Sequence, residues 1–185
     1  MEHKQENFFI DVLKFSIIAL VIVIPIRIFI AQPFIVQGAS MDPTFKTNEY
    51  LIVDQLSYRF EAPQRGEVII FRFPLEPQKF FIKRIIGLPG ETITLTGSTI
   101  IIKNNKNPDG FILDEPYLET ANLTSDTSEI TLKHDEYFVL GDNRKASSDS
   151  RVWGPLSEEF IVGRAFLRLL PITETGIFPG DYSNP

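Results

Sequence analysis

The sequence predicts a mainly β protein, in which an N-terminal transmembrane helix precedes an antiparallel β domain. Two observations predict this class: an almost entirely apolar run at residues 15–31, and nine short apolar runs separated by turn residues along most of the remaining chain. Apolar runs of about four to eight residues between glycine, proline, asparagine or aspartate are typical of strands. An unbroken apolar run approaching about 20 residues is typical of a membrane helix.

The apolar run reads FSIIALVIVIPIRIFIA and covers residues 15–31. A helix of this length rises about 25 Å, slightly less than the bilayer core of about 30 Å, and Lys14 and Arg27 can reach the two headgroup regions. Pro25 is expected to kink the helix, which membrane helices tolerate. A cleaved signal peptide would have a shorter apolar region, and a buried core helix would show a polar face. We therefore expect residues 1–32 to form a cytoplasmic tail and a single uncleaved anchor.

The predicted strands follow in order. They occupy residues 50–53, 67–73, 79–86, 92–95, 99–103, 111–113, 129–132, 137–140 and 163–169. The segment NNKNPDG at 104–110 has the composition of a hairpin loop. The segment LSEEF at 156–160 is expected to begin a short helix with Ser157 as its N-cap.

The composition excludes several classes of function. The chain is 43% hydrophobic and 23% charged, as folded proteins are, and its net charge of −6 argues against nucleic-acid binding. Cysteine is absent, which excludes disulfides, thiolate metal sites and cysteine nucleophiles. The two histidines, His3 and His134, lie in the N-terminal tail and in a polar turn. A metal site built from several histidines is therefore excluded, and a serine–histidine–aspartate triad lacks a suitable base.

A lysine interrupts the predicted strand at residues 79–86, within the sequence FFIKRIIG. Because side chains alternate between the faces of a strand, Lys83 shares one face with Phe81 and Ile85. A lysine on a strand most often covers apolar surface with its stem while its amine reaches water. An amine that stays among apolar side chains instead tends to lose its proton, because burial penalises the charged form.

Ser40, in the sequence GASMDPT, completes a candidate catalytic pair. A serine after a glycine turn is ordinarily a turn residue or a cap. Its hydroxyl becomes a nucleophile only when a base takes its proton, and a neutral lysine can serve as that base. To be half neutral at about pH 7.5, Lys83 needs a pKa about 3 below its ordinary 10.4, at a cost of about 4 kcal/mol. The apolar neighbours of Lys83 are able to impose this change, so the pair predicts a serine–lysine hydrolase.

The segment GDNRKASSDSRVWG at 141–154 is the third candidate. Four charged residues lie close together in it, with three serines between them: Asp142, Arg144, Asp149 and Arg151. One interpretation is an ion-paired surface loop. The other is a loop that supports an active site and supplies a serine that hydrogen-bonds the lysine amine.

These segments resemble the bacterial type I signal peptidases, also called leader peptidases. Four motifs carry the resemblance in the family's order: SMDPT at 40–44 (nucleophile), RGEVIIF at 65–71 (the strand that follows), KRIIGLPGE at 83–91 (general base) and GDNRKASSDSR at 141–151 (the last motif). They lie behind the N-terminal apolar run, and the resemblance covers roughly residues 34–170.

The resemblance implies roles for individual residues. Ser40 would be the nucleophile and, through its backbone N–H, an oxyanion donor, while Lys83 would be the general base. Ser147 stands where the family has a serine that hydrogen-bonds the lysine amine. The expected structural ion pairs involve Asp142, Arg144, Asp149 and Arg151. The expected substrate groove is lined by Phe34, Val36, Met41, Leu51, Phe81 and Ile82.

The family fold is a largely antiparallel β catalytic core with a smaller inserted β region. Here the extracytoplasmic peptidase domain would occupy residues 33–185, with the insertion at 97–136. Three positions depart from the family pattern. Lys145 and Ala146 stand where the family often has Asp and Asn, and Gly38 stands where some members have a serine that helps bind the oxyanion. The oxyanion site of this chain would therefore depend more on the backbone of Ser40.

The implied function is that of a membrane-bound serine endopeptidase that removes N-terminal signal peptides from exported preproteins. Its shallow groove would accept alanine at the residues one and three before the cut. The implied partners are preproteins and membrane lipid, with no nucleic acid, metal or cofactor, and the chain would be monomeric. Because Ser40 follows Ala31 by only nine residues, the site would lie near the bacterial cytoplasmic membrane. We expect the N-terminus in the cytoplasm and the catalytic domain outside.

Two alternatives compete with this function. A catalytically inactive membrane-anchored β domain that binds or organises envelope proteins would have the same fold. Such a domain has no need of a buried lysine, a serine and a bracing loop together. A self-cleaving repressor-type serine–lysine protease is disfavoured by the apolar N-terminal run and by the lack of a DNA-binding segment in the sequence.

Overall fold

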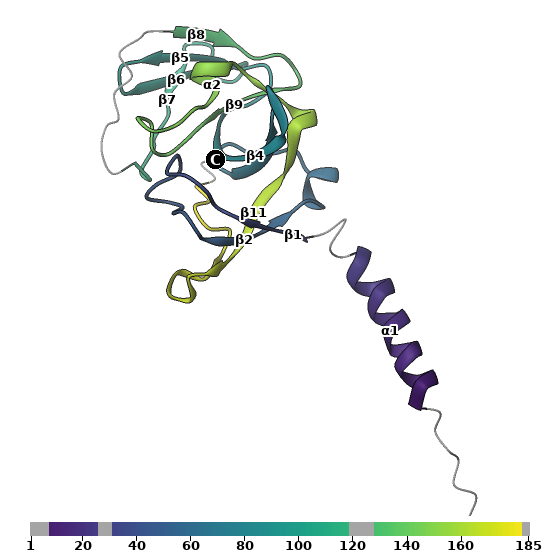
Figure 1. Ribbon diagram of the computed structural model, residues 1–185. Helices are drawn as coiled ribbons and strands as arrows, with labels where there is room; N and C mark the ends of the chain where they lie inside the picture. Colours follow the sequence, from purple (N-terminus) through teal and green to yellow (C-terminus); the bar gives the residue numbers. More distant parts are fainter. Residues whose placement is uncertain (1–7, 26–30, 119–127, 183–185) are drawn as a thin grey trace, which may run out of the picture.

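In a computed structural model of the chain, an N-terminal helix precedes two antiparallel sheets, so the predicted mainly β class is confirmed (Figure 1). The structure describes residues 8–25, 31–118 and 128–182. The helices and strands are α1 (Phe8–Pro25), β1 (Ala31–Ile35), β2 (Tyr50–Asp54), β3 (Val68–Phe73), β4 (Glu76–Gly87), β5 (Thr92–Thr96), β6 (Thr99–Lys103), β7 (Phe111–Ile112), β8 (Ser128–Thr131), β9 (Glu136–Leu140), α2 (Ser150–Trp153), β10 (Leu156–Ser157), β11 (Ile161–Leu170) and β12 (Gly176–Ile177).

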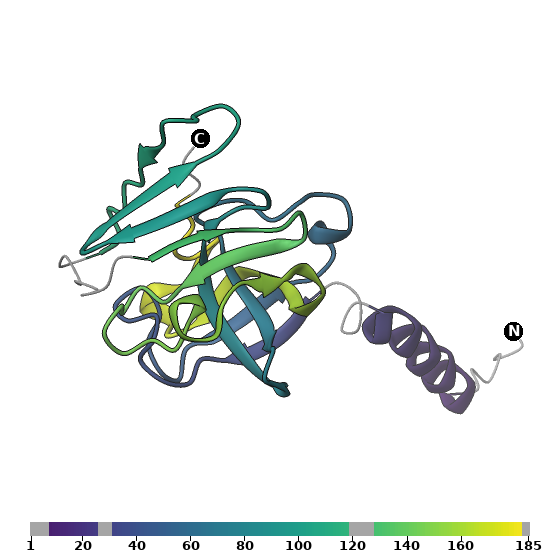
Figure 2. The same cartoon turned by 90° about the horizontal axis from the view of Figure 1, so that it is seen from above.

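The larger sheet has eight strands in the order β1-β2-β11-β3-β4-β9-β10, with β12 paired to β11. The smaller sheet has four strands in the order β7-β6-β5-β8. The smaller sheet begins with β5 at Thr92. The division of the chain that places an inserted region at 97–136 stays a prediction. Figures 1 and 2 both show α1 extending away from the sheets.

The central strand β3 is buried on both of its faces. Val68 and Ile70 join one apolar cluster with β2 and β11, while Ile69 and Phe71 join another with β9 and β10. This explains why its sequence is continuously apolar and does not alternate with polar residues. A third cluster joins the smaller sheet to β4 and β9. The candidate site lies beside β3, on β4 and the loops around it.

All nine predicted strands are present, with ends that differ by at most three residues. The strands β1, β10 and β12 and the short helix α2 were not predicted. The short helix predicted to begin at 156–160 is present only as a 3₁₀ turn, Glu158–Phe160, with Ser157 at its N-cap position, because Leu156 is fully buried in strand β10, opposite Tyr137 of β9. Ser157 makes no side-chain capping hydrogen bond there. Burial of the leucine in the core has overridden the local helix signal.

The N-terminal helix differs from the predicted anchor at 15–31. The helix α1 begins at Phe8 and ends at Pro25, while Ala31 already belongs to strand β1, opposite Asp54 of β2. Arg27 lies outside the described residues. Within the described ranges, no helix has both the length and the apolar character that a membrane crossing requires.

Arg84 of β4 connects the parts of the structure that surround the site. Its side chain is fully buried, and its Nε and Nη2 donate to the two carboxylate oxygens of Asp142 at 2.9 and 2.6 Å. Its Nη1 donates to the carbonyls of Gly66 and Gly180. Asp142 also accepts a hydrogen bond of 2.6 Å from the Thr44 hydroxyl. One guanidinium therefore joins β4 to the segments before β3, after β9 and near the end of the chain.

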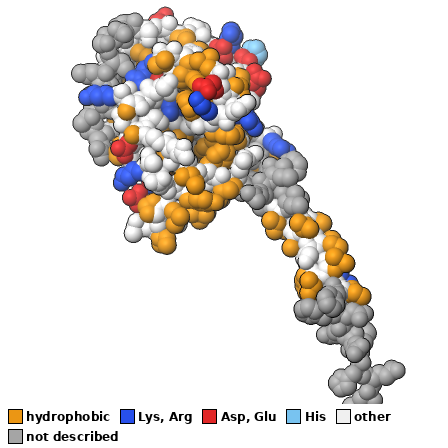
Figure 3. Space-filling view, in the orientation of Figure 1, with side chains coloured by type: hydrophobic (Ala, Val, Ile, Leu, Met, Phe, Trp, Pro, Cys, Tyr) orange, Lys and Arg blue, Asp and Glu red, His pale blue; other side chains and the backbone are white. Residues whose placement is uncertain are grey.

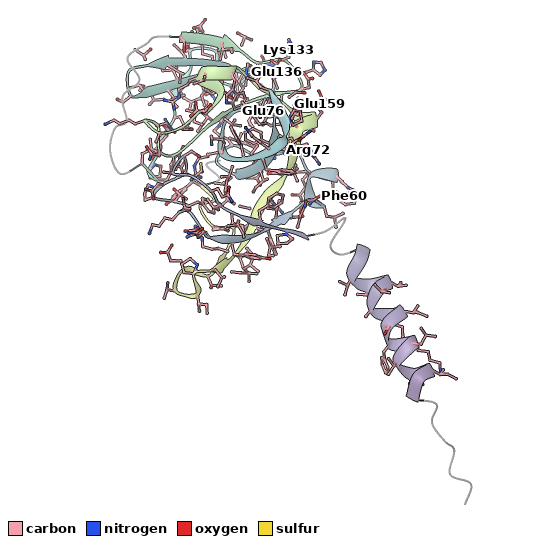
Figure 4. The ribbon with its side chains drawn as sticks, in the orientation of Figure 1. Phe60, Arg72, Glu76, Lys133, Glu136 and Glu159 are labelled. Carbon is pink, nitrogen blue, oxygen red and sulfur yellow. The ribbon has the colours of Figure 1, made fainter. Side chains whose placement is uncertain are left out.

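We predict that Arg84→Met lowers the free energy of unfolding by about 3 to 5 kcal/mol, because Asp142 would remain buried without its cation. Urea unfolding of the full chain in detergent micelles, followed through the fluorescence of its single tryptophan, Trp153, measures this change. The matched control is Lys133→Met, since Lys133 is 75% exposed and pairs with Glu136 at the surface (Figure 4). The control is expected to unfold near the wild-type midpoint. Equal losses in both variants would contradict the assigned role of Arg84.

Candidate functional site

Ser40 lies at the start of a turn between β1 and β2. The turn is set by Gly38, whose φ of +87° lies in the left-handed region that favours glycine. Met41 is buried in the core, whereas Ser40 is only partly buried and faces a groove. Gly38, noted above as a departure from the family pattern, is thus the residue that this backbone requires.

Lys83 lies on β4, opposite Ile69 of β3 in the strand register. Its side chain is only 3% exposed, and its Nζ lies 2.8 Å from the Ser40 Oγ and 2.9 Å from the carbonyl oxygen of Ile82. Burial lowers the pKa of Lys83 to about 8, although the carboxylates of Asp149 and Asp142 limit the fall. The structure therefore brings the serine and a readily deprotonated lysine within hydrogen-bonding distance.

An aromatic group supplies part of the apolar surroundings of the amine. The Lys83 Nζ lies 5.2 Å from the centre of the Phe81 ring. Phe73 stacks on Phe81 with ring centres 4.5 Å apart, and Trp153 contacts Phe73 edge-on at 6.0 Å. These rings leave little room for water on their side of the amine, which is the condition that favours its neutral form.

The loop after β9 packs directly against the serine. The backbone N–H of Asn143 donates to the Ser40 carbonyl at 3.0 Å. A Cβ on Gly141 would collide with the Ser147 hydroxyl and with the same carbonyl oxygen, so the close approach requires glycine. The Ser147 Oγ is buried, and among the described residues it has no hydrogen-bond partner. Its predicted bond to the lysine amine stays a prediction.

The four charged residues of this loop form ion pairs, but two of the partners lie elsewhere in the chain. Asp149 pairs with Arg151 at 2.8 Å, within the loop. Asp142 pairs with Arg84 of β4, and Arg144 pairs with Glu115. Neither Arg84 nor Glu115 was predicted from the sequence as a partner.

A signal for Arg84 was present in the sequence. It follows Lys83 in an apolar strand and so points to the opposite face, where an arginine needs a buried anion. No comparable signal marks Glu115, which lies in a polar segment between strands.

Asp149 has a second role at the start of α2. Its carboxylate accepts hydrogen bonds from the backbone N–H groups of Arg151, as an N-cap, and of Gly141, at 3.2 Å. Because Asp149 is fully buried, these contacts fix the two ends of the loop relative to each other. Ser147 is thereby held between two fixed points.

A groove with a volume of about 680 Å³ runs past Ser40 and Lys83. Its walls include five of the six residues expected to line the substrate groove: Phe34, Val36, Leu51, Phe81 and Ile82. The sixth, Met41, is 1% exposed and belongs to the core beneath the turn. Ala146 and Ser148 of the loop after β9 also line the groove.

The geometry supports nucleophilic chemistry. A serine hydroxyl, an amine with a lowered pKa and an apolar groove meet at one point. In the described part of the chain, the backbone N–H of Ser40 donates to no partner, so it remains available to an oxygen of a bound molecule. No group of three histidine, aspartate or glutamate side chains in that same part is arranged to hold a metal ion.

Comparison with known proteins places the chain among the signal peptidases. The family model described as "Signal peptidase, peptidase S26" matches residues 9–170. A "Probable signal peptidase I-2" from Synechocystis is 35% identical over 97% of this chain and 82% of its own length. A "Signal peptidase I P" from Bacillus subtilis subsp. natto is 33% identical over 92% of this chain and 94% of its own length.

A crystal structure of a signal peptidase I from Enterococcus faecalis is 32% identical, with a TM-score of 0.48, and covers 56% of this chain and 97% of its own. The family model and the curated relatives confirm the resemblance and the enzyme class predicted from the sequence. The chain belongs to the signal peptidase family, peptidase S26.

Proposed function

We propose that the chain is a membrane-bound serine endopeptidase that cleaves N-terminal signal peptides from exported preproteins with Ser40 as nucleophile and Lys83 as general base. The observation that carries the proposal is the distance of 2.8 Å between the Lys83 Nζ and the Ser40 Oγ, in a place where burial lowers the pKa of the amine. The alternative of a catalytically inactive binding domain finds no support, because the curated relatives are named as signal peptidases.

The proposed reaction begins with neutral Lys83. The amine takes the hydroxyl proton as the Ser40 Oγ attacks the scissile carbonyl carbon. The negative charge on the carbonyl oxygen is stabilised by the backbone N–H of Ser40. When the peptide C–N bond breaks, Lys83 gives its proton to the leaving amine and the acyl group stays on Ser40. A water molecule, activated by the same lysine, then releases the acyl group and restores the serine.

The loop after β9 supports this pair in the proposed mechanism. Ser147 would hydrogen-bond the lysine amine and so direct it toward Ser40, a role that suits its buried and unpartnered hydroxyl. The ion pairs of Asp142, Arg144 and Asp149 would keep the loop in place without taking part in the chemistry.

The groove suggests which residues of the preprotein are recognised. Its apolar walls accept an extended chain, and the space beside Ser40 is bounded by large side chains such as Phe34, Leu51 and Phe81. Small side chains fit next to such walls, whereas larger ones collide with them. We therefore expect alanine at the residues one and three before the cut to be preferred.

The membrane attachment rests on exposed apolar side chains. Along α1, Leu13, Phe15 and Val21 are 60%, 72% and 66% exposed, and Figure 3 shows hydrophobic side chains gathering on this helix. Phe60 is 80% exposed and lies on the side of the domain from which α1 extends (Figure 4). Such surface is costly in water and favourable in lipid.

The proposed orientation puts the N-terminus in the cytoplasm and the catalytic domain outside. In the structure α1 ends at Pro25, and Ser40 follows Pro25 by 15 residues, which span at most about 50 Å, so Ser40 cannot lie far from the membrane surface. Export brings the end of the signal peptide's apolar segment to the outer surface of the cytoplasmic membrane. A nucleophile held near that surface meets its substrate there.

The central prediction concerns the two reacting residues. Ser40→Ala and Lys83→Arg are both expected to abolish cleavage of a preprotein in detergent micelles. The first removes the attacking hydroxyl, and the second replaces the amine with a guanidinium, which does not give up its proton. The matched control, Lys103→Arg, changes a lysine of the smaller sheet and is expected to cleave like the wild type. Appreciable cleavage by Lys83→Arg would show that the lysine is not the base.

The pH dependence of the reaction tests the lowered pKa of Lys83. Since the neutral amine is the active form, kcat/KM is expected to rise about tenfold per pH unit at low pH and to level off above an apparent pKa of about 8. Initial rates on one preprotein between pH 6 and 10 measure this profile. A plateau that begins only near the ordinary lysine pKa of 10.5, or a rate that falls as the pH rises, would contradict the proposed base.

The orientation is tested by protease accessibility. A protease added to intact spheroplasts is expected to digest the domain that follows Gln32 while a cytoplasmic marker protein stays protected. Complete protection of the domain in sealed spheroplasts, with digestion only after lysis, would contradict the proposed topology.

A further inference from the structure

The C-terminal segment at residues 178–182 packs against Arg84 and the turn that contains Thr44. It lies beyond residue 170, where the match to the family model ends. The backbone N–H of Phe178 donates to the Phe166 carbonyl at 2.7 Å, which fixes the segment to β11. The Gly180 carbonyl then accepts a hydrogen bond from the Arg84 Nη1, and the ring of Tyr182 lies 5.4 Å from the same guanidinium.

Gly180 is held at a position that excludes any side chain. Its φ of +73° lies in the left-handed region, and a Cβ built there would be 2.5 Å from the Thr44 Cγ2 and 3.0 Å from the Phe45 Cε2. A contact of 2.5 Å between non-bonded carbon atoms essentially never occurs in folded proteins, so either the segment or the Thr44 side chain would have to move. The glycine thus lets the end of the chain touch the turn that carries Ser40.

Thr44 links this contact to both reacting groups. Thr44 lies in the same turn as Ser40, and the backbone N–H of Phe45 closes that turn by donating to the Met41 carbonyl at 2.8 Å. Toward the lysine, the Thr44 hydroxyl donates to Asp142, which is paired with Arg84, the residue next to Lys83 on β4. Displacing Thr44 would therefore disturb the Ser40 turn and the β4 contact together.

We propose that the segment at residues 178–182 is a positioning element of the peptidase site, in which Gly180 holds Thr44 and Arg84 and so sets the distance between Ser40 and Lys83. This inference rests on the proposed roles of Ser40 and Lys83. No residue of the segment lines the groove, so we expect it to act on the alignment of the reacting groups and not on substrate binding.

The test compares Gly180→Ala with Gly176→Ala in the full chain in detergent micelles. A Cβ on Gly176 meets no atom within 4 Å and that residue does not have a positive φ, so this control is expected to keep wild-type kinetics. Gly180→Ala is expected to lower kcat per folded molecule by about ten- to a hundredfold while KM changes by less than about twofold. The folded fraction is taken from Trp153 fluorescence.

A second substitution provides a rescue. Thr44→Ser removes the Cγ2 that meets the new Cβ and keeps the hydroxyl that donates to Asp142. The double variant Gly180→Ala with Thr44→Ser is therefore expected to regain much of the lost kcat. If Gly180→Ala does not fold, Tyr182→Ala replaces it, since this change removes a ring packed 5.2 Å from Tyr117 and leaves Gly180 in place. It is expected to lower kcat severalfold at constant KM.

The outcomes separate this inference from the proposed function. Wild-type kcat in Gly180→Ala, or in Tyr182→Ala if that variant is used, would overturn the inference, as would a failure of Thr44→Ser to restore any kcat. In each of these cases an inactive Ser40→Ala, assayed in parallel, leaves the proposed function standing. Cleavage by Ser40→Ala at the wild-type rate would overturn the proposed function itself.

Discussion

The arrangement of the site depends on the hydrogen bonds that the buried guanidinium of Arg84 makes. The guanidinium bonds both oxygens of Asp142 and the carbonyls of Gly66 and Gly180, and the ring of Tyr117 lies 3.8 Å from it. A charge that is completely removed from water is tolerated only when such partners surround it. Because these partners belong to segments far apart in the sequence, satisfying one cation also fixes how those segments meet.

Lys83 and Arg84 are neighbours on β4, and the cost of burying a charged side chain is offset differently for each of them. The Arg84 guanidinium is surrounded by a carboxylate and by backbone carbonyls. Lys83 points to the other face, where its Nζ contacts a hydroxyl and a carbonyl but no carboxylate, and the pKa of the amine falls. One strand therefore carries a permanent charge that joins parts of the structure and a removable charge at the proposed catalytic pair.

The sequence predicts what depends on local patterns and misses what depends on distant partners. The nine strands followed from apolar runs between turn residues, and the contact of Ser40 with Lys83 agrees with what the four motifs led us to expect. Strand β1 was not predicted as a strand because it begins at Ala31, the last residue of the apolar run that was expected to be helical. Glu115, and the burial of Met41 beneath the turn, depend on tertiary packing that no local pattern encodes.

The lowered pKa of Lys83 also has a consequence for folding. In the unfolded chain the amine has its ordinary pKa of 10.5, whereas burial in the folded protein lowers it to about 8. The folded state then binds the proton more weakly than the unfolded state, which lowers the free energy of unfolding by about 3 kcal/mol below pH 8. This penalty is relieved as the pH rises from about 8 to 10.5. At neutral pH, the proposed role of Lys83 and the stability of the fold therefore oppose each other: an apolar residue of similar size would give a more stable domain that lacks the proposed base.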